Sequence, residues 1–196
     1  MERLLIATVA VIEKKGLAGV TIPEIAASAG VSTGSVYRRF TDKDDLVRSA
    51  FVRILEASQE ANRANLPADR FHGRSLGEAL RAVSRALVAQ YGGRMGLLKA
   101  LDQFLETQTD AAFRERAVGL IEANFRLIVG ALLPFREQIA AADPERAITF
   151  ALLSAMTVIE AHKLQPPLLW QRLLPLDDEA LATETTRAMA AYLASP

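Results

Sequence analysis

The 196-residue sequence has no cysteine, one tryptophan and two histidines. Without cysteine the chain has neither disulfides nor thiolate chemistry, which suits a reducing, cytoplasmic setting. The histidines, His72 and His162, are far apart and belong to no metal-binding pattern, so neither a metal nor another cofactor is expected. The sequence motifs of serine hydrolases and of phosphate-binding or dinucleotide-binding loops are also missing. We therefore do not expect an enzyme.

The chain also has no excess of one charge and no long apolar run. Its 23 basic residues balance 23 acidic residues. Residues 1–48 carry seven basic and six acidic groups, a local net charge of +1 (7 − 6), so any binding of nucleic acid depends on where charges are placed. No apolar stretch reaches the ~20 residues that span a bilayer, and the N-terminus lacks the order of a secretion signal. A membrane is therefore not an expected partner.

What the sequence does contain is a helical pattern. Apolar residues make up 51% of the chain, and sequences that alternate with period two are missing, so we predict an all-α fold of about nine helices. A Pro-, Asp- and Gly-containing connection at 66–75 separates two regions, and the apolar segment 164–176 is interrupted by three prolines and is predicted to be irregular. The expected helices are 2–15, 22–29, 32–40, 43–62, 75–91, 94–108, 110–133, 143–163 and 177–193.

The N-terminal region carries clear signals for helix ends. Thr21 followed three residues later by Glu24 is a capping box, and Gly30 can end the short helix that begins there. Ser32 is the expected cap of the next helix. Two short helices joined at Gly30-Val31 have the layout of a helix-turn-helix.

The outward face of the helix predicted at 32–40 fits the major groove of DNA. On a helical projection Val36 and Phe40 face inward, whereas Gly34, Ser35 and Arg38 lie opposite. Gly34 costs roughly 1 kcal/mol relative to Ala within a helix, and a close approach to base edges would explain it. Thr33 and Ser35 can exchange hydrogen bonds with bases, and Arg38 can contact guanine. Tyr37, Arg39, Thr21 and Lys43 are better placed for phosphates.

The stretch TIPEIAASAGVSTGSVYRRFTDKDDL resembles the DNA-binding signature of the TetR family of bacterial transcriptional regulators. The resemblance covers about the first 50 residues. It implies a homodimer with an N-terminal helix-turn-helix domain of three helices, at 1–48, and a C-terminal effector-binding and dimerisation domain, at 49–196. The helix at 43–62 would connect them. It further implies a repressor that is released by a small molecule. A symmetric dimer would bind a palindromic DNA operator, and the large apolar side chains of the C-terminal half favour an apolar effector.

Family positions carry over to this sequence residue by residue. The residues that match the family's base-contacting surface are Thr33, Ser35, Tyr37 and Arg38, and those that match positions commonly holding phosphates are Thr21, Tyr37, Arg39 and Lys43. Ser32 and Gly34, at the start of the same helix, complete the set of candidate DNA-binding residues. Two features depart from the family pattern. Arg38-Arg39 replaces a more frequent aromatic or histidine pairing, so the operator sequence does not transfer. The sequence also begins directly on its first helix without a basic leader, so either the major groove alone provides specificity or a leading segment is missing.

The C-terminal half offers candidates for an effector pocket and for a dimer interface. Large, adaptable side chains and a few polar groups indicate the pocket: Tyr91, Met95, Phe104, Glu122, Phe125, Met156 and His162. Apolar stripes on the last two long helices indicate the interface: Phe150, Ser154, Thr157, Val158, Leu181, Thr185, Ala188 and Tyr192. A second stripe on the last helix, with Ala182, Met189 and Leu193, would pack against its own chain.

A different class of function remains open at this point. The weak basicity of the N-terminal region also fits an all-helical adaptor or small-molecule carrier whose N-terminal hairpin binds a protein. A salt titration separates the two hypotheses, because contacts with phosphates make binding steeply dependent on salt.

Overall fold

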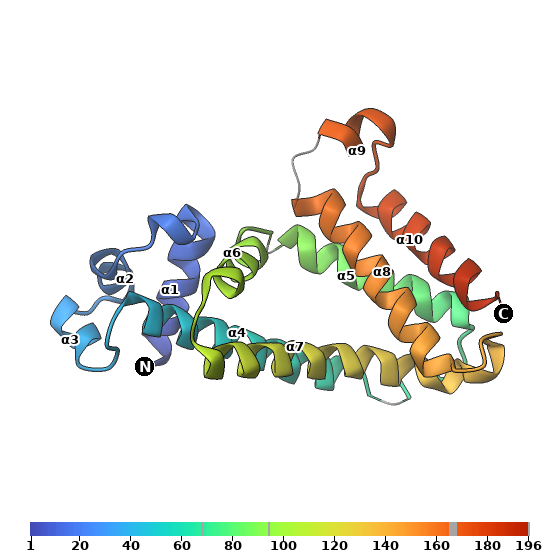
Figure 1. Cartoon of the computed structure of the whole chain (residues 1–196), viewed down its shortest axis with the longest axis horizontal. Helices are drawn as coiled ribbons and strands as arrows, with labels where there is room; N and C mark the ends of the chain where they lie inside the picture. The colour runs from blue at the N-terminus through green and yellow to red at the C-terminus, as the bar shows by residue number, and fades with distance from the viewer. Residues whose placement is uncertain (68, 94, 165–167, 196) are drawn as a thin grey trace. The chain divides into compact units, whose positions relative to one another are not determined.

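A computed structural model describes residues 1–67, 69–93, 95–164 and 168–195, without the side chains of 92, 93, 95, 164, 168, 169 and 171. These residues form helices and connections, and none of them forms a strand (Figure 1). The all-α prediction is therefore confirmed. The helices are α1 (Glu2–Lys15), α2 (Ile22–Ala29), α3 (Thr33–Tyr37), α4 (Lys43–Asn65), α5 (Leu76–Gly93), α6 (Met95–Thr107), α7 (Ala111–Leu132), α8 (Pro144–Leu164), α9 (Leu168–Leu173) and α10 (Asp178–Leu193), with 3₁₀ turns at Leu17–Gly19 and Leu133–Gln138.

Local signals set most of the helix ends. Asp177 caps α10 by accepting a hydrogen bond from the Ala180 amide at 2.8 Å, as its position before the helix predicts. The side chain of Asp143 accepts from the Arg146 amide at the start of α8. Gly16 ends α1 at a φ of 69°, but its ψ of 170° lies outside the left-handed helical region expected there.

Two predicted elements differ from the structure. The third helix ends at Tyr37 and not near Phe40, because Arg38 and Arg39 continue as a turn whose amides bond to the carbonyls of Gly34 and Val36. The proline-containing segment 164–176 includes a short helix, α9. The prolines stand before this helix and after it, so they do not interrupt its hydrogen bonds.

The chain forms two compact units, which we treat separately. The N-terminal unit comprises Met1–Ala61 and Gly96–Asn124, and the C-terminal unit comprises Asn62–Met95 and Phe125–Pro196. Helices α4 and α7 each contribute to both units. The boundary predicted at residue 48 falls inside α4, and its use as a functional boundary stays a prediction.

The core of the N-terminal unit draws on distant parts of the sequence. Phe51 of α4 is fully buried, and its ring centroid lies 5.4 Å from that of Phe104 of α6. Phe104 in turn meets Phe113 of α7 edge to face at 5.6 Å. The same cluster holds Ile12 and Ile25 from the first two helices, so α6 and the start of α7 complete the core on which the N-terminal helices pack.

The C-terminal unit is built around α5, α8 and α10, which pack against one another (Figure 1). Its most buried side chains include Leu80 of α5, Ile148 and Leu152 of α8, and Leu193 of α10. The second stripe predicted on the last helix is buried as expected, since Ala182, Met189 and Leu193 are almost inaccessible to solvent.

One helical segment is long and apolar enough to cross a membrane by length and composition alone. It covers Ala111–Gln138, with a mean hydropathy of 1.5 over its best window. Its apolar face nevertheless has protein to pack on, because Phe113 and Ala117 belong to the core of the N-terminal unit. Charged residues within it, such as Glu122 and Arg126, would cost about 2.5–3.5 kcal/mol each at the centre of a bilayer. The segment fits a core helix of a soluble protein.

Candidate nucleic-acid interface

The turn between α2 and α3 is held by a cap, a glycine and a brace. Thr21 caps α2, with its hydroxyl accepting from the Glu24 amide at 3.4 Å, which is the Thr21 half of the predicted capping box. The Glu24 carboxylate accepts from the Thr21 hydroxyl at 3.1 Å. Gly30 ends α2 in the left-handed region, at φ 67° and ψ 39°. Arg3 of α1 donates to the carbonyl of Ala29 at 2.9 Å. Sequence reasoning missed this brace, because nothing in a separation of 26 residues signals the contact.

Helix α3 presents small polar groups at its beginning. Ser32 caps it, with its hydroxyl accepting from the Ser35 amide at 3.2 Å, and the two hydroxyls lie 3.0 Å apart. Thr33 and Gly34 are exposed, whereas Val36 is fully buried beneath them. A Cβ added to Gly34 would meet only the Ser32 hydroxyl, at 3.9 Å, so the protein itself leaves this position open.

The two arginines leave from the end of α3 rather than from within it. Arg38 is the C-terminal cap residue, and its guanidinium donates to the Ser35 hydroxyl at 2.7 Å. This places the forked donor of Arg38 over the same small residues that start the helix. Arg39 is exposed in the turn that follows. Arg38 therefore faces the outward surface as predicted, although the helix that was expected to carry it is shorter.

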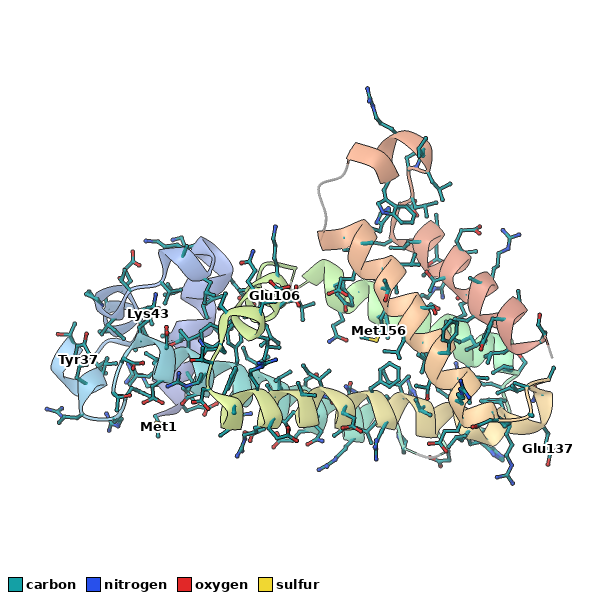
Figure 2. The ribbon with its side chains drawn as sticks, viewed as in Figure 1. Met1, Tyr37, Lys43, Glu106, Glu137 and Met156 are labelled. Carbon is teal, nitrogen blue, oxygen red and sulfur yellow. The ribbon has the colours of Figure 1, made fainter. Side chains whose placement is uncertain are left out.

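Tyr37 and Lys43 lie on either side of this turn. Tyr37 is 59% exposed and projects from the end of the N-terminal unit (Figure 2). Lys43 is the first residue of α4 and is half-buried. Asp42 caps α4, since its carboxylate accepts from the Asp45 amide at 2.7 Å. Asp45 in turn accepts from the Thr41 amide at 2.9 Å, which fixes the direction in which α4 begins.

One ion pair takes charge away from this surface. The Lys15 ammonium donates to the Glu24 carboxylate, and this hydrogen bond is the main reason that the pKa of Glu24 lies below its ordinary value of 4.5. Lys15 is thereby neutralised by a neighbour next to the cap at Thr21. The cations left to face outward around α3 are Arg38, Arg39 and Lys43.

These features together can bind a nucleic acid through its phosphates and through the exposed edges of its bases. Hydroxyl groups at the start of α3 both donate and accept, and the forked guanidinium of Arg38 matches two acceptors on one base. Exposed Tyr37 and Arg39 and half-buried Lys43 can donate to phosphate oxygens beside them. Among the described residues, no group of three or more His, Asp or Glu side chains is arranged to hold a metal ion.

The residues predicted for an effector pocket are distributed over both units. Phe104 is a packing residue of the N-terminal core, because its ring contacts two other phenylalanines there, and Glu122 is exposed on α7. Tyr91 is buried on α5, Phe125 and Met156 are half-buried, and Met95 starts α6 with its side chain outside the described residues.

His162 ends up beside an aromatic ring rather than beside the rest of that set. It stacks edge to face on Trp170 at 5.7 Å. Its Nδ1 atom is buried and has no hydrogen-bond partner among the described residues. None of the seven predicted pocket residues lines the groove between α8 and α10 or the cavity between α4, α5 and α7, so their role stays a prediction.

Most residues predicted for a dimer interface share one groove between α8 and α10. Its volume is about 380 Å³, and Trp170 and Leu174 also line it. Phe150, Val158 and Tyr192 are 56%, 40% and 44% exposed, and the Phe150 and Tyr192 ring centroids lie 5.1 Å apart. The predicted residues that line the groove are Phe150, Ser154, Val158, Leu181, Thr185, Ala188 and Tyr192, whereas Thr157 is exposed on α8 outside the lining.

Two of these residues are more enclosed than an interface stripe requires. Leu181 and Thr185 are buried within their own chain, and the Thr185 hydroxyl is bonded to the Leu181 carbonyl at 2.7 Å. They form the floor of the groove, and its walls are the exposed side chains. The place of Leu181 and Thr185 in a dimer interface stays a prediction.

The N-terminal region of the chain is similar in sequence to known proteins. The sequence profile of the bacterial regulatory proteins of the tetR family matches residues 4–50. The HTH-type transcriptional regulator BetI of Stenotrophomonas maltophilia (strain R551-3) is 42% identical over 60 residues, which are 31% of this chain and 31% of BetI. The aligned part thus spans about a third of that relative.

The fold of the whole chain is similar to that of solved regulators. A putative TetR-family transcriptional regulator from Mesorhizobium loti MAFF303099 superimposes with a TM-score of 0.72 at 19% identity, covering 98% of this chain and 94% of that one. The transcriptional regulator FadR from Bacillus subtilis, solved in complex with stearoyl-CoA, gives a TM-score of 0.69 at 17% identity, with 97% of both chains covered. Residues 4–50, which include the helix-turn-helix, therefore carry the sequence profile of the tetR family of bacterial regulatory proteins, and the fold of the whole chain is similar to that of TetR-family regulators.

Proposed function

We propose that the protein is a homodimeric repressor that binds a palindromic DNA operator and is released by a small effector. In this proposal α3 enters the major groove by its beginning, and the hydroxyls of Thr33 and Ser35, together with Arg38, contact bases. Thr21, Tyr37, Arg39 and Lys43 hold the phosphates on either side. The protein acts in the cytoplasm, where its operator lies.

The observation that supports this proposal most directly is the start of α3. It is exposed, its side chains are small, and hydrogen-bond donors surround it. Gly34 has open space where a side chain would be, and the Ser32 cap and Arg38 flank it. A helix that served only to fill the core would gain stability from alanine at this position. Close approach of a duplex gives a reason for glycine.

The groove between α8 and α10 supports the dimer. Exposed aromatic side chains such as Phe150 and Tyr192 are typical of the buried centre of an interface, and here they surround an apolar hollow. A second copy related by a twofold axis would present the same groove and fill both. Such a dimer places two recognition helices about 34 Å apart, one turn of DNA, which demands a palindromic site.

Helix α4 supports control by an effector. Its first residue, Lys43, lies at the candidate interface, and its last residues belong to the C-terminal unit. An effector that prefers one position of this helix would change the spacing of the two recognition helices, provided that it binds the DNA-competent state less tightly. FadR from Bacillus subtilis, whose structure holds stearoyl-CoA, is a precedent for an apolar chain as ligand in this fold.

Selection from a random duplex pool, followed by fluorescence anisotropy, tests the proposal. We expect selective retention of a palindrome and a steep loss of affinity as salt rises. Arg38→Ala should cost roughly 1–3 kcal/mol and relax preference at one or two base pairs, whereas Lys43→Ala should weaken all sequences alike and reduce the salt slope by about one. Arg63→Ala, an exposed change near the other end of α4, is the matched control.

The alternative of an adaptor or carrier makes the opposite prediction. An N-terminal hairpin that binds protein would retain no duplex selectively at low ionic strength, and that outcome would refute the repressor. Equal effects of Arg38→Ala and Arg63→Ala on operator variants would refute the assignment of base contacts to Arg38. Transcription in vitro from the selected operator then distinguishes repression from activation.

Sedimentation velocity tests the dimer. Phe150→Glu places a charge in an exposed wall of the groove, so the monomer should fold and the dimer should dissociate, with loss of the 2 kcal/mol or more that is usual for an aromatic anchor. Ile6→Glu is the matched control, since Ile6 is also exposed but lies on α1. An unchanged dimer in Phe150→Glu would place the interface elsewhere.

A further inference from the structure

A second cavity lies in the C-terminal unit, where the end of α4 meets α5 and α7. Its volume is about 310 Å³, within the range of small-molecule sites. Phe71, Val83 and Leu87 form an apolar floor and are buried almost completely. The polar lining residues include Asn65, Arg70 and Gln90, all exposed at the rim. The cavity is therefore apolar inside and polar at its mouth.

The charge at the mouth has one sign. Arg70 is the only charged residue among the described residues that line the cavity. Among the described residues, no carboxylate lies within ion-pair distance of the Arg70 guanidinium. Ion pairs with carboxylates are formed by five other arginines: Arg48, Arg53, Arg85, Arg116 and Arg187. A guanidinium with five donors and no acceptor binds a planar carboxylate in two-point fashion.

We infer that this cavity binds a small amphipathic monocarboxylate, with the chain on the apolar floor and the carboxylate on Arg70. Burying a chain against Phe71, Val83 and Leu87 is favourable by about 0.8 kcal/mol for each CH₂ group removed from water. The exposed amides of Asn65 and Gln90 can donate to the carboxylate beside Arg70. The last turn of α4 forms part of the wall, so the occupant touches the helix that starts at the candidate DNA interface.

The role of this cavity as the effector site rests on the proposed function, but its binding chemistry does not. The probe is sodium octanoate, compared with 1-octanol, which has the same chain and no charge. Titration calorimetry on the full-length protein without DNA measures both. We expect one octanoate per chain and a weaker affinity for the alcohol. Methyl NMR signals of Val83 and Leu87 should shift on binding, and that of Val158 in the other groove should not.

Three variants test where the carboxylate and the alkyl chain of octanoate bind. Arg70→Gln should weaken octanoate binding about tenfold and leave octanol binding unchanged, because only the charged contact is lost. Arg63→Gln, a nearby exposed arginine outside the cavity, should change neither. Ala86→Trp fills the cavity from an exposed position of α5 and should abolish both. Arg63→Gln and circular dichroism together show whether any loss comes from altered folding.

The inference is overturned if octanoate fails to bind at millimolar concentration, if Arg70→Gln and Arg63→Gln have equal effects, or if the shifted methyl signals belong to the α8–α10 groove. The selected operator provides a separate readout. Binding of octanoate at Arg70 without any change in operator affinity would refute the effector role and leave both the site and the repressor intact. Absence of operator binding altogether would refute the proposed function and leave the site intact.

Discussion

Replacing Gly34 by alanine separates the stability of the protein from its proposed contact with DNA. The added methyl group would lie 3.9 Å from the Ser32 hydroxyl, an ordinary van der Waals distance, so the fold has room for it. Gly→Ala at a compatible position stabilises by about 0.4–1 kcal/mol, chiefly because the unfolded chain has less freedom. For a chain of this length that corresponds to a rise in Tm of roughly 1–4 °C.

DNA binding should change in the opposite direction. If base edges pack directly on the Gly34 backbone, an inserted methyl group costs about 1–3 kcal/mol, as overpacking does in a protein core. The operator Kd would then rise roughly 5- to 150-fold. Thermal unfolding and fluorescence anisotropy on the same preparation measure both effects.

The matched control is Gly119→Ala, at an exposed glycine within α7 that also has open space around its Cβ. It should raise Tm by a similar amount and leave the operator Kd unchanged. A Gly34→Ala protein that is more stable and binds the operator as tightly as before would refute the close approach. The glycine would then need another explanation.

Three further predictions concern the framework of the candidate site. Thr21→Ala removes the cap of α2 and should lower the free energy of unfolding by about 0.5–2 kcal/mol in urea titrations, whereas Thr21→Ser should keep most of it. Phe104→Ala should cost about 3–5 kcal/mol, because it empties the centre of the N-terminal core, and a loss below 1 kcal/mol would contradict that packing. The Lys15–Glu24 pair holds the pKa of Glu24 below its ordinary 4.5, so its stabilisation is present above about pH 4.5 and is lost as pH falls through the lowered pKa. The Tm difference between wild type and Lys15→Met should therefore shrink between pH 7 and pH 3, and a constant difference would contradict the ion pair.

Local sequence signals predicted the elements of the N-terminal region well. Thr21, Gly30 and Ser32 act on their own neighbours within three or four residues, so capping chemistry can be seen in the sequence alone. The buried face of α2 follows a local signal of the same kind, since its buried residues Ile22, Ile25, Ala26 and Ala29 recur at helical spacing. The end of α3 was predicted three residues too late, because no glycine or proline marks it.

Contacts between distant segments could not be predicted in this way. Phe104 was expected at a cavity from its size and type, and it lies in the N-terminal core because α6 packs there. Arg70 lies in the connection 66–75, which its Pro, Asp, Gly and Ser residues mark in the sequence as a turn region. The cavity beside it exists because α4, α5 and α7 meet there, and no local pattern encodes that meeting. Leu181 and Thr185 show the same limit, because helical spacing places both on one stripe without indicating how deep they lie.

The position of Phe104 and Phe113 in the sequence bears on how the protein is made. The ribosome synthesises the first 61 residues of the N-terminal unit before it reaches α6 and α7. The last buried residue of the core cluster, Ala117, follows 56 residues later (117 − 61). At 5–20 residues per second this interval lasts roughly 3–11 s, during which the nascent chain exposes the face of Phe51. A gene fragment that stops after α4 would leave that face uncovered permanently. Chimeric proteins that carry the first four helices of this chain therefore need residues 96–124 as well.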